Sequence, residues 1–311
     1  MEFLRILEEI RTPFFDTFFS LITRFGEETL FILLGIIFFW CINKKEGYYL
    51  LTIGFLGTII NQFLKLSFRI PRPWVLDSNF NPVDSAVDGA TGYSFPSGHT
   101  QSSVGIFGGI ARWNKQLAVR IISVTIAVLV PFSRMYLGVH TPLDVGVSVI
   151  IALLLIFGLH PIITKDKNGV ALRIMFAVIT VLSLGYLLWV NLYNFPADID
   201  MHNYESGLKN AYKMFGCTLA IWLSFELDNK FIKFETKATF PAQILKLLLG
   251  LIPVILIKTF LKAPLIALIG NSYIADGIRY FILAAFAGCV WPLTFKWFSK
   301  LFRKKENIDK L

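Results

Sequence analysis

The chain has 311 residues, of which 55% are hydrophobic and only 16% are charged, and its mean hydropathy is +0.62. Soluble domains carry about 25% charged residues, so this composition excludes a soluble domain with one anchor and indicates a polytopic membrane protein. The formal net charge of +9 sits in short segments between apolar runs, which argues against nucleic acid as a partner. Cys41, Cys217 and Cys289 lie far apart, a spacing that fits neither a metal site nor a disulfide pair.

Ten segments are apolar enough to be candidate spanning helices, so the sequence predicts an all-α, polytopic transmembrane helical bundle. The first segment is short and carries Asp16, which also fits a helix lying along the membrane surface. The chain starts with charges of both signs and no cleavage site, so we expect this segment to be retained. The segments are 12–24, 28–43, 47–66, 98–113, 117–137, 142–160, 170–193, 207–227, 241–262 and 275–298.

The polar segment Lys165–Gly169 is the best candidate for a boundary along the chain. It separates residues 1–164, a predicted core of six helices that holds every motif described below, from residues 165–311. The second part is predicted to contain about four further helices and a basic cytoplasmic tail over 296–310, which is expected to meet anionic lipid. Its function stays open.

The distribution of Lys and Arg predicts the topology. With the N-terminus in the cytoplasm, both termini are cytoplasmic, and the motifs face the periplasmic, extracellular or lumenal side. This arrangement places 20 of the 30 basic residues inside: Arg5, Arg11, Lys44, Lys45, Arg112, Lys115, Arg120, Lys165, Lys167, Arg173, Lys230, Lys233, Lys237, Lys246, Lys296, Lys300, Arg303, Lys304, Lys305 and Lys310.

Three polar motifs interrupt the apolar sequence on this outer side. They supply three cations, Lys65, Arg72 and Arg134, of the kind that phosphoryl transfer needs around the transferred group. Ser97 and Gly98 open a predicted helix, whose free N–H groups favour a bound anion. The motifs are Lys65-x6-Arg72-Pro73, Pro96-Ser97-Gly98-His99 and Ser133-Arg134-x5-His140-x3-Asp144.

Two of the four histidines fall in these motifs, where His99 and His140 provide an acid or base and a nucleophile. Asp144 can accept the second N–H of His140, and it also reads as the end of a capping box that starts at Thr141. No carboxylate pair or histidine cluster with metal spacing accompanies them. We therefore expect a metal-independent site without a cofactor.

The complete pattern resembles the three-part signature of the type 2 phosphatidic acid phosphatase superfamily, over about residues 28–160. The resemblance implies a six-helix core with its site at the outer face. It implies that His140 is the nucleophile, Asp144 its orienting partner, and His99 the acid for the leaving group and then the base for water. It also implies a phosphate cradle made of Lys65, Arg72, Ser97, Gly98 and Arg134.

The expected function is an integral membrane phosphatase that acts on a lipid phosphomonoester or pyrophosphate, with the membrane and a phosphorylated lipid as its partners. Three alternatives stay open: a lipid phosphotransferase with the same residues, a phosphatase for a soluble ester, and a non-catalytic lipid-binding or transport protein. The particular lipid and the oligomeric state are open as well.

Overall fold

The computed structural model describes residues 1–302, and every regular element in this range is a helix, as the sequence predicts. The expected basic tail over 296–310 lies partly outside the described residues. Short 3-10 or π segments are η1 (Thr23–Gly26), η2 (Phe38–Ile42), η3 (Asp228–Ile232), η4 (Phe286–Val290) and η5 (Trp291–Thr294). The α-helices are α1 (Glu2–Glu9), α2 (Pro13–Ile22), α3 (Glu28–Ile37), α4 (Lys44–Phe68), α5 (Pro73–Leu76), α6 (Asp84–Val87), α7 (Gly98–Trp113), α8 (Leu117–Tyr136), α9 (Pro142–Lys165), α10 (Val170–Leu192), α11 (Met201–Leu227), α12 (Phe240–Phe260), α13 (Lys262–Ile269), α14 (Ser272–Ala285) and α15 (Phe295–Lys300).

Within the described residues, six helical stretches are long and apolar enough to cross a membrane, which agrees with a polytopic bundle. A seventh crossing is possible where Pro13–Gly26 and Glu28–Ile42 meet at a bend of 51° and pass the same test only together. The sequence predicts two separate spans there. α7 and α11 are helical as predicted but are not among these stretches. α7 has 16 residues, fewer than the 18 that such a stretch needs, and the first half of α11 is polar. The six are 44–76, 117–136, 142–165, 170–192, 240–260 and 272–300.

The helices form two compact units, which the chain enters alternately. The first unit contains residues 1–34, 49–165 and 185–211, and the second contains residues 35–48, 166–184 and the chain from 212 onward. All three motifs lie in the first unit. The boundary expected after residue 164 stays a prediction. The last residues of α10 and the first residues of α11 belong to the first unit.

Close packing of α7 on α4 fixes the frame of the first unit. Gly105 and Gly109 on α7 face Ile53 and Leu50 on α4, and an added Cβ would lie 2.9 Å from Ile53 Cγ2 and 2.8 Å from Leu50 Cδ2. Small residues at such interfaces let two membrane helices approach closely. The start of α7, which carries the second motif, is thereby held against the helix that carries Lys65.

Two aromatic clusters mark the two ends of α4 within the first unit. Tyr49, near the start of α4, contacts Trp113 and His160 at ring distances of 5.4 and 5.7 Å. Phe63, near the other end, contacts Trp189 at 4.9 Å. Aromatic side chains of this kind gather at membrane–water interfaces. The motif loop follows the Phe63 end of α4, so the site is expected at the level of one interface.

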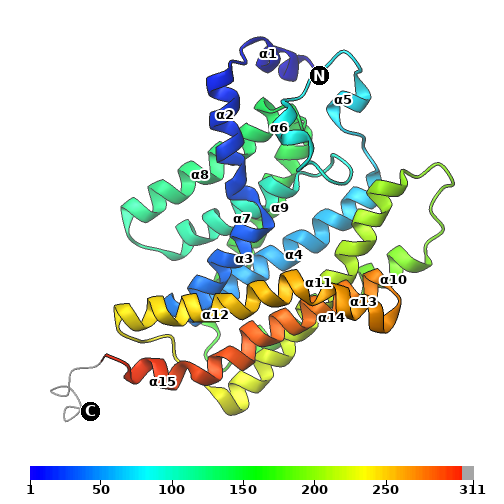
Figure 1. Cartoon of the computed structure of the whole chain (residues 1–311). Coiled ribbons are helices and arrows are strands. Elements are labelled where there is room, and N and C mark those ends of the chain that lie inside the picture. Colours follow the sequence, from blue (N-terminus) through cyan, green and yellow to red (C-terminus); the bar gives the residue numbers. More distant parts are fainter. Residues whose placement is uncertain (303–311) are drawn as a thin grey trace. The chain divides into compact units, whose positions relative to one another are not determined.

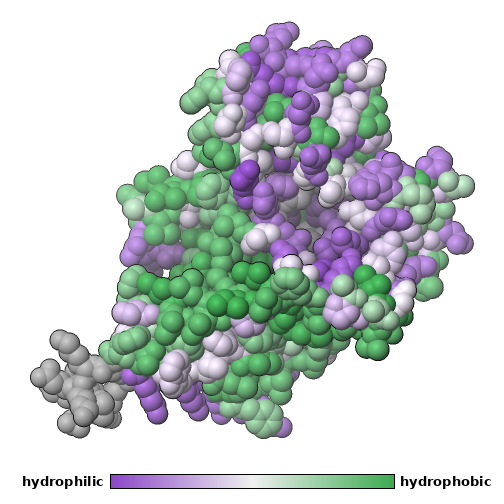
Figure 2. All heavy atoms as spheres, viewed as in Figure 1, coloured by the Kyte–Doolittle hydropathy of each residue, from purple (hydrophilic) through white to green (hydrophobic). Residues whose placement is uncertain are grey.

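The N-terminal helix packs on the motif loop. Arg5 pairs with Asp77 at 2.5 Å and donates to the carbonyl of Asn79 at 2.9 Å, while Leu7 packs with Phe80. Figure 1 shows α1, α5 and α6 at one end of this unit, and Figure 2 shows polar side chains over that end and hydrophobic ones over α8. The N-terminus and the motif loop therefore share a side.

This contact bears on the expected topology. From the sequence, the N-terminus and the motifs are predicted to lie on opposite sides of the membrane, which requires two separate crossings before Lys44. Pro13–Gly26 and Glu28–Ile42 qualify as a membrane span only together, with a bend of 51° between them. A single crossing by this pair would put the N-terminus and the motifs on one side, and the sides of the termini stay a prediction. Hydropathy alone does not reveal the bend, because it registers two apolar runs.

The second unit pairs its own buried charges. Asp276, which is fully buried, pairs with Lys262 at 2.9 Å and with Arg279 at 2.5 Å. Lys246 donates to the carbonyl of Trp40 at 2.8 Å. Buried charges that are paired in this way serve the fold.

We expect Glu2→Cys and Asn79→Cys to react with a membrane-impermeant maleimide from the same side, because α1 contacts the 77–81 segment. Lys115→Cys, in the connection between α7 and α8, is expected to react from the other side. The measurement is labelling in sealed vesicles of defined orientation, with Ser at the native positions Cys41, Cys217 and Cys289. Labelling of Glu2→Cys together with Lys115→Cys would show that the bent pair crosses twice.

Candidate active site

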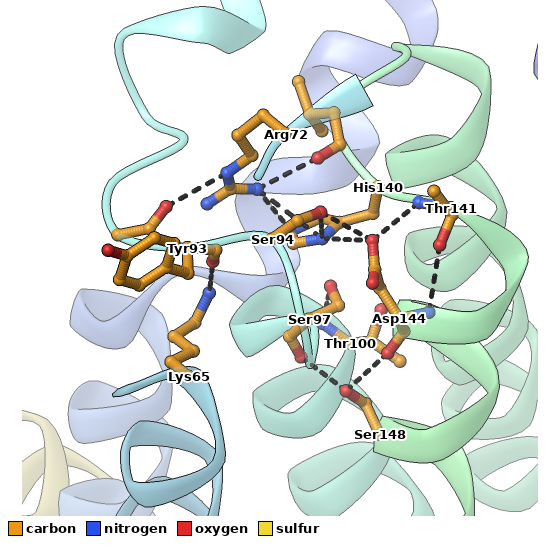
Figure 3. A network of polar contacts seen from close by, with 12 residues as sticks. Lys65, Arg72, Tyr93, Ser94, Ser97, Thr100, His140, Thr141, Asp144 and Ser148 are labelled. Atoms are coloured by element: carbon orange, nitrogen blue, oxygen red, sulfur yellow. Dashed lines mark hydrogen bonds and ion pairs between the residues drawn. The ribbon is translucent and has the colours of Figure 1, made fainter. Parts of the chain in front are cut away.

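Arg72 is fixed by backbone carbonyls of the motif loop and of the third motif. Its Nε donates to the carbonyl of Gly92 at 3.1 Å, and its two NH groups donate to Thr91 at 2.8 Å and to Val139 at 2.9 Å. Figure 3 shows the guanidinium held between these segments. Arg72 is buried, so the fork of donors keeps one orientation.

Lys65 and Arg134 supply two more buried cations. Lys65, in the last turn of α4, donates from Nζ to the carbonyl of Tyr93. Arg134, in the last turn of α8, donates from NH1 to Oγ1 of Thr23 at 2.8 Å, while its Nε and NH2 are buried without a partner. A buried N–H of a charged group that makes no hydrogen bond costs free energy of folding. A bound phosphate would satisfy both donors.

The second motif opens α7 beside these cations. Ser97 is the N-cap, and its Oγ accepts from the N–H of Thr100 at 3.4 Å. The first N–H groups of a helix lack intrahelical acceptors, so the helix end that begins at Gly98 has donors suited to an anion. Ser97 also donates from its own N–H to the carbonyl of Asp144 at 3.1 Å. The second and third motifs are therefore locked together.

His140 lies between Arg72 and Asp144. Its Nε2 is 2.9 Å from an NH of Arg72, which can only donate, so Nε2 presents a lone pair. Its Nδ1 faces Oδ2 of Asp144 at 3.5 Å, which is longer than an ordinary N–H···O bond of about 2.7–3.2 Å. This tautomer, with the proton on Nδ1, leaves the lone pair on Nε2.

Asp144 is itself held by two donors. Its Oδ2 accepts from Ser94 Oγ at 2.6 Å and from the N–H of Thr141 at 2.7 Å, and the N–H of Asp144 donates to Oγ1 of Thr141 at 3.3 Å. The capping box predicted from the sequence is thus confirmed, and the same carboxylate faces His140. Ser94 was missed, because a lone serine in a turn-rich loop carries no signal of its own.

Burial lowers the pKa of His140 well below its ordinary value, and the positive charges of Arg72, Arg134 and Lys65 lower it further, together with His99. The imidazole is therefore neutral near pH 7, as a nucleophile must be. These interactions also show that the charged residues of all three motifs lie within electrostatic reach of His140.

The structure thus brings the eight residues singled out from the sequence into one unit, and their individual roles remain predictions. His99 lies in the first turn of α7 and is half-buried. The described residues contain no group of three or more His, Cys, Asp or Glu side chains with the geometry of a metal site. The eight are Lys65, Arg72, Ser97, Gly98, His99, Arg134, His140 and Asp144.

Comparison with known families agrees with this geometry. Residues 46–168 match the family model described as PAP2 superfamily, and residues 212–304 match the one described as PAP2 superfamily phosphatase, transmembrane extension. The chain belongs to the PAP2 superfamily. The first match contains all three motifs, and the second covers most of the part without motifs, so a multi-pass membrane protein is established for both parts.

Individual PAP2 relatives are similar over less than half of the chain. The probable sphingosine-1-phosphate phosphatase of Dictyostelium discoideum is 29% identical over 160 residues, which cover 47% of this chain and 38% of the relative. Undecaprenyl-diphosphatase BcrC of Bacillus subtilis is 31% identical over 115 residues, which cover 37% and 56%. The matches thus span less than two thirds of either relative. Among solved structures, Aquifex aeolicus LpxE is 29% identical with a TM-score of 0.43, over 50% of this chain and 91% of that chain.

Ser94→Ala is expected to lower turnover by this PAP2 protein without unfolding it. The substitution removes a hydrogen bond to a charged carboxylate, and such bonds contribute about 1.5–3 kcal/mol. The freed Asp144 would then hold the Nδ1 proton of His140 less well. The measurement is kcat in detergent, with Ser67→Ala as the matched control, since Ser67 bonds only within α4 at 2.8 Å. Equal activity in the two variants would remove Ser94 from the site.

The lowered pKa of His140 also predicts how stability depends on pH. Between this lowered value and the ordinary value of about 6.5, the unfolded chain binds the extra proton and the folded protein does not. The contribution of His140 to stability is therefore full above about pH 6.5 and is lost as the pH falls. The wild-type unfolding temperature should drop more than that of His140→Gln between about pH 7.5 and about pH 5. Parallel curves would contradict a neutral, buried His140.

Proposed function

We propose that this PAP2 protein is an integral membrane phosphatase that hydrolyses a phosphomonoester or terminal pyrophosphate of a lipid through a phosphohistidine at His140. The observation that supports it most is the lone pair of His140 Nε2, which lies beside Arg72 and within electrostatic reach of Lys65 and of Arg134, whose Nε and NH2 are buried without a partner. The relatives are named for sphingosine 1-phosphate, undecaprenyl diphosphate and phosphatidylglycerophosphate, which are all phosphorylated lipids.

In the first step the phosphate enters the space before His140, and its oxygens take the free donors of Arg134 and the N–H groups at the start of α7. Arg72 transfers its NH bond from His140 Nε2 to a phosphate oxygen, which exposes the lone pair. Nε2 attacks phosphorus in line, and the bond to the lipid oxygen breaks with its electron pair going to that oxygen. His99 donates the proton that completes the lipid alcohol or lipid phosphate.

In the second step water replaces the lipid. His99, now without its proton, accepts a proton from the water, whose oxygen bonds to phosphorus. The P–N bond breaks, and its electron pair returns to Nε2 of His140. Asp144, held by Ser94 and Thr141, stabilises the positive charge that the first step places on the imidazole ring and that the second step removes. The side-chain cations neutralise the phosphate in place of a metal, so this cycle is metal-independent.

The motif side is the non-cytoplasmic side in this proposal. In this proposal Arg5 and Arg11 lie on the motif side, because α1 contacts the motif loop. Eighteen of the thirty Lys and Arg residues then lie on the opposite side. These include Lys44, Lys45 and Arg112, which lie at the other ends of the helices. The excess still favours that opposite side as the cytoplasm.

Purified protein in detergent is expected to release orthophosphate from at least one member of a panel of lipid phosphates, and His140→Ala is expected to lose this release entirely. The panel contains phosphatidate, phosphatidylglycerophosphate, sphingosine 1-phosphate and a prenyl diphosphate. The wild type with an acid-quenched, 32P-labelled substrate should in addition retain label that is stable to base and labile to acid, as a phosphohistidine is.

His160→Ala is the matched control, since His160 lies with Tyr49 and Trp113 at the other end of the unit. It should release phosphate at the wild-type rate. EDTA should leave the rate unchanged in the wild type, and a loss that magnesium restores would contradict the metal-independent cycle. Release that persists in His140→Ala would refute the nucleophile. No release by folded protein, unless an added alcohol takes the phosphoryl group, would favour a phosphotransferase.

A further inference from the structure

The bend of the N-terminal helix pair contacts two motif residues. η1, the 3-10 turn Thr23–Gly26, lies between α2 and α3, where the direction changes by 51°. Thr23 accepts the NH1 donor of Arg134 at 2.8 Å, and Gly26 packs on the backbone of His99. This turn lies before residue 46, where the match to the PAP2 family model begins.

Thr23 is the side chain that orients Arg134. Arg134 is 2% exposed, and its one side-chain bond within the described residues is the bond to Thr23. A guanidinium is a rigid plane, so fixing NH1 also fixes the directions of Nε and NH2. Those two groups are the buried donors that have no partner in the described chain. Thr23 therefore aims the free side of Arg134 without occupying it.

Gly26 sets the position of His99. A Cβ added at Gly26 would lie 2.7 Å from the carbonyl oxygen and 2.9 Å from Cβ of His99. Both distances are shorter than side chains tolerate, and the first one is to backbone, which does not yield without moving the start of α7. Only glycine thus lets η1 approach α7 this closely, and the first turn of α7 rests against it.

We propose that η1 is a part of the active site, in which Thr23 is the positioning residue for Arg134 and Gly26 for His99. The proposal rests on the function proposed above for those two residues, but it adds a segment from outside the motifs. Phe25 supports the placement, because its ring packs on Phe107 of α7 at 6.1 Å. The two contacts act on different steps, since Arg134 holds phosphate and His99 transfers protons.

The first test measures orthophosphate affinity, which needs no turnover. Thr23→Val removes the hydroxyl at nearly constant volume, and it is expected to weaken orthophosphate binding by about tenfold, the size expected for one bond to a charged group. Thr23→Ser keeps the acceptor and should bind within about twofold of the wild type. Thr17→Val is the matched control, because Thr17 on α2 bonds only to the carbonyl of Pro13 at 2.8 Å.

The second test compares kinetic constants. Gly26→Ala is expected to lower kcat while orthophosphate affinity stays near that of the wild type. Thr23→Val is expected to lower both kcat and orthophosphate affinity. Gly158→Ala is the control, since nothing lies within 4 Å of a Cβ at Gly158. Unfolding temperatures of all variants are measured alongside, so that a loss of fold is recognised.

Wild-type orthophosphate affinity in Thr23→Val, or an equal loss in Thr23→Ser, would overturn the role of Thr23. Full kcat in Gly26→Ala would overturn the role of Gly26. Absence of orthophosphate binding by the folded wild type would overturn both. Binding that depends on Thr23 in a protein without hydrolysis would support the positioning of Arg134 while the phosphatase proposal failed.

Discussion

The site depends on a shortage of negative charge. Lys65, Arg72 and Arg134 are buried together, and Asp144 is the one carboxylate that the described residues place near them. In the second unit, by contrast, the buried Arg279 pairs with the buried carboxylate of Asp276. The unbalanced charge in a weakly polar surrounding makes a doubly negative phosphate the natural complement.

The long motif loop has a direct role in this balance. The carbonyls of Thr91 and Gly92 accept from Arg72, and the carbonyl of Tyr93 accepts from Lys65. Carbonyl dipoles stabilise a cation without cancelling its charge. The loop therefore keeps the cations in place and leaves their field available to a ligand, which a set of carboxylates would not.

The candidate site could be predicted from the sequence because its members are side chains at fixed spacings. The pair of His140, just before α9, and Asp144, in its first turn, is one example, and the Ser97 cap is another. The carbonyls that hold Arg72 could not be predicted, since every residue has a carbonyl. Thr23 could not be predicted for a different reason. Its partner Arg134 lies 111 residues away in the sequence, and their contact depends on a bend that a hydropathy profile does not show.

The alternating order of the two units constrains how the protein is made. The chain passes from one unit to the other after residues 34, 48, 165, 184 and 211, so each unit is assembled from separate stretches. During synthesis the first unit remains incomplete until residue 211 has left the ribosome, although the last motif residue lies at 144. By then two stretches of the second unit are already in the membrane. Neither unit corresponds to a single stretch of chain, and the first unit is complete only after two stretches of the second unit, 35–48 and 166–184, have been synthesised.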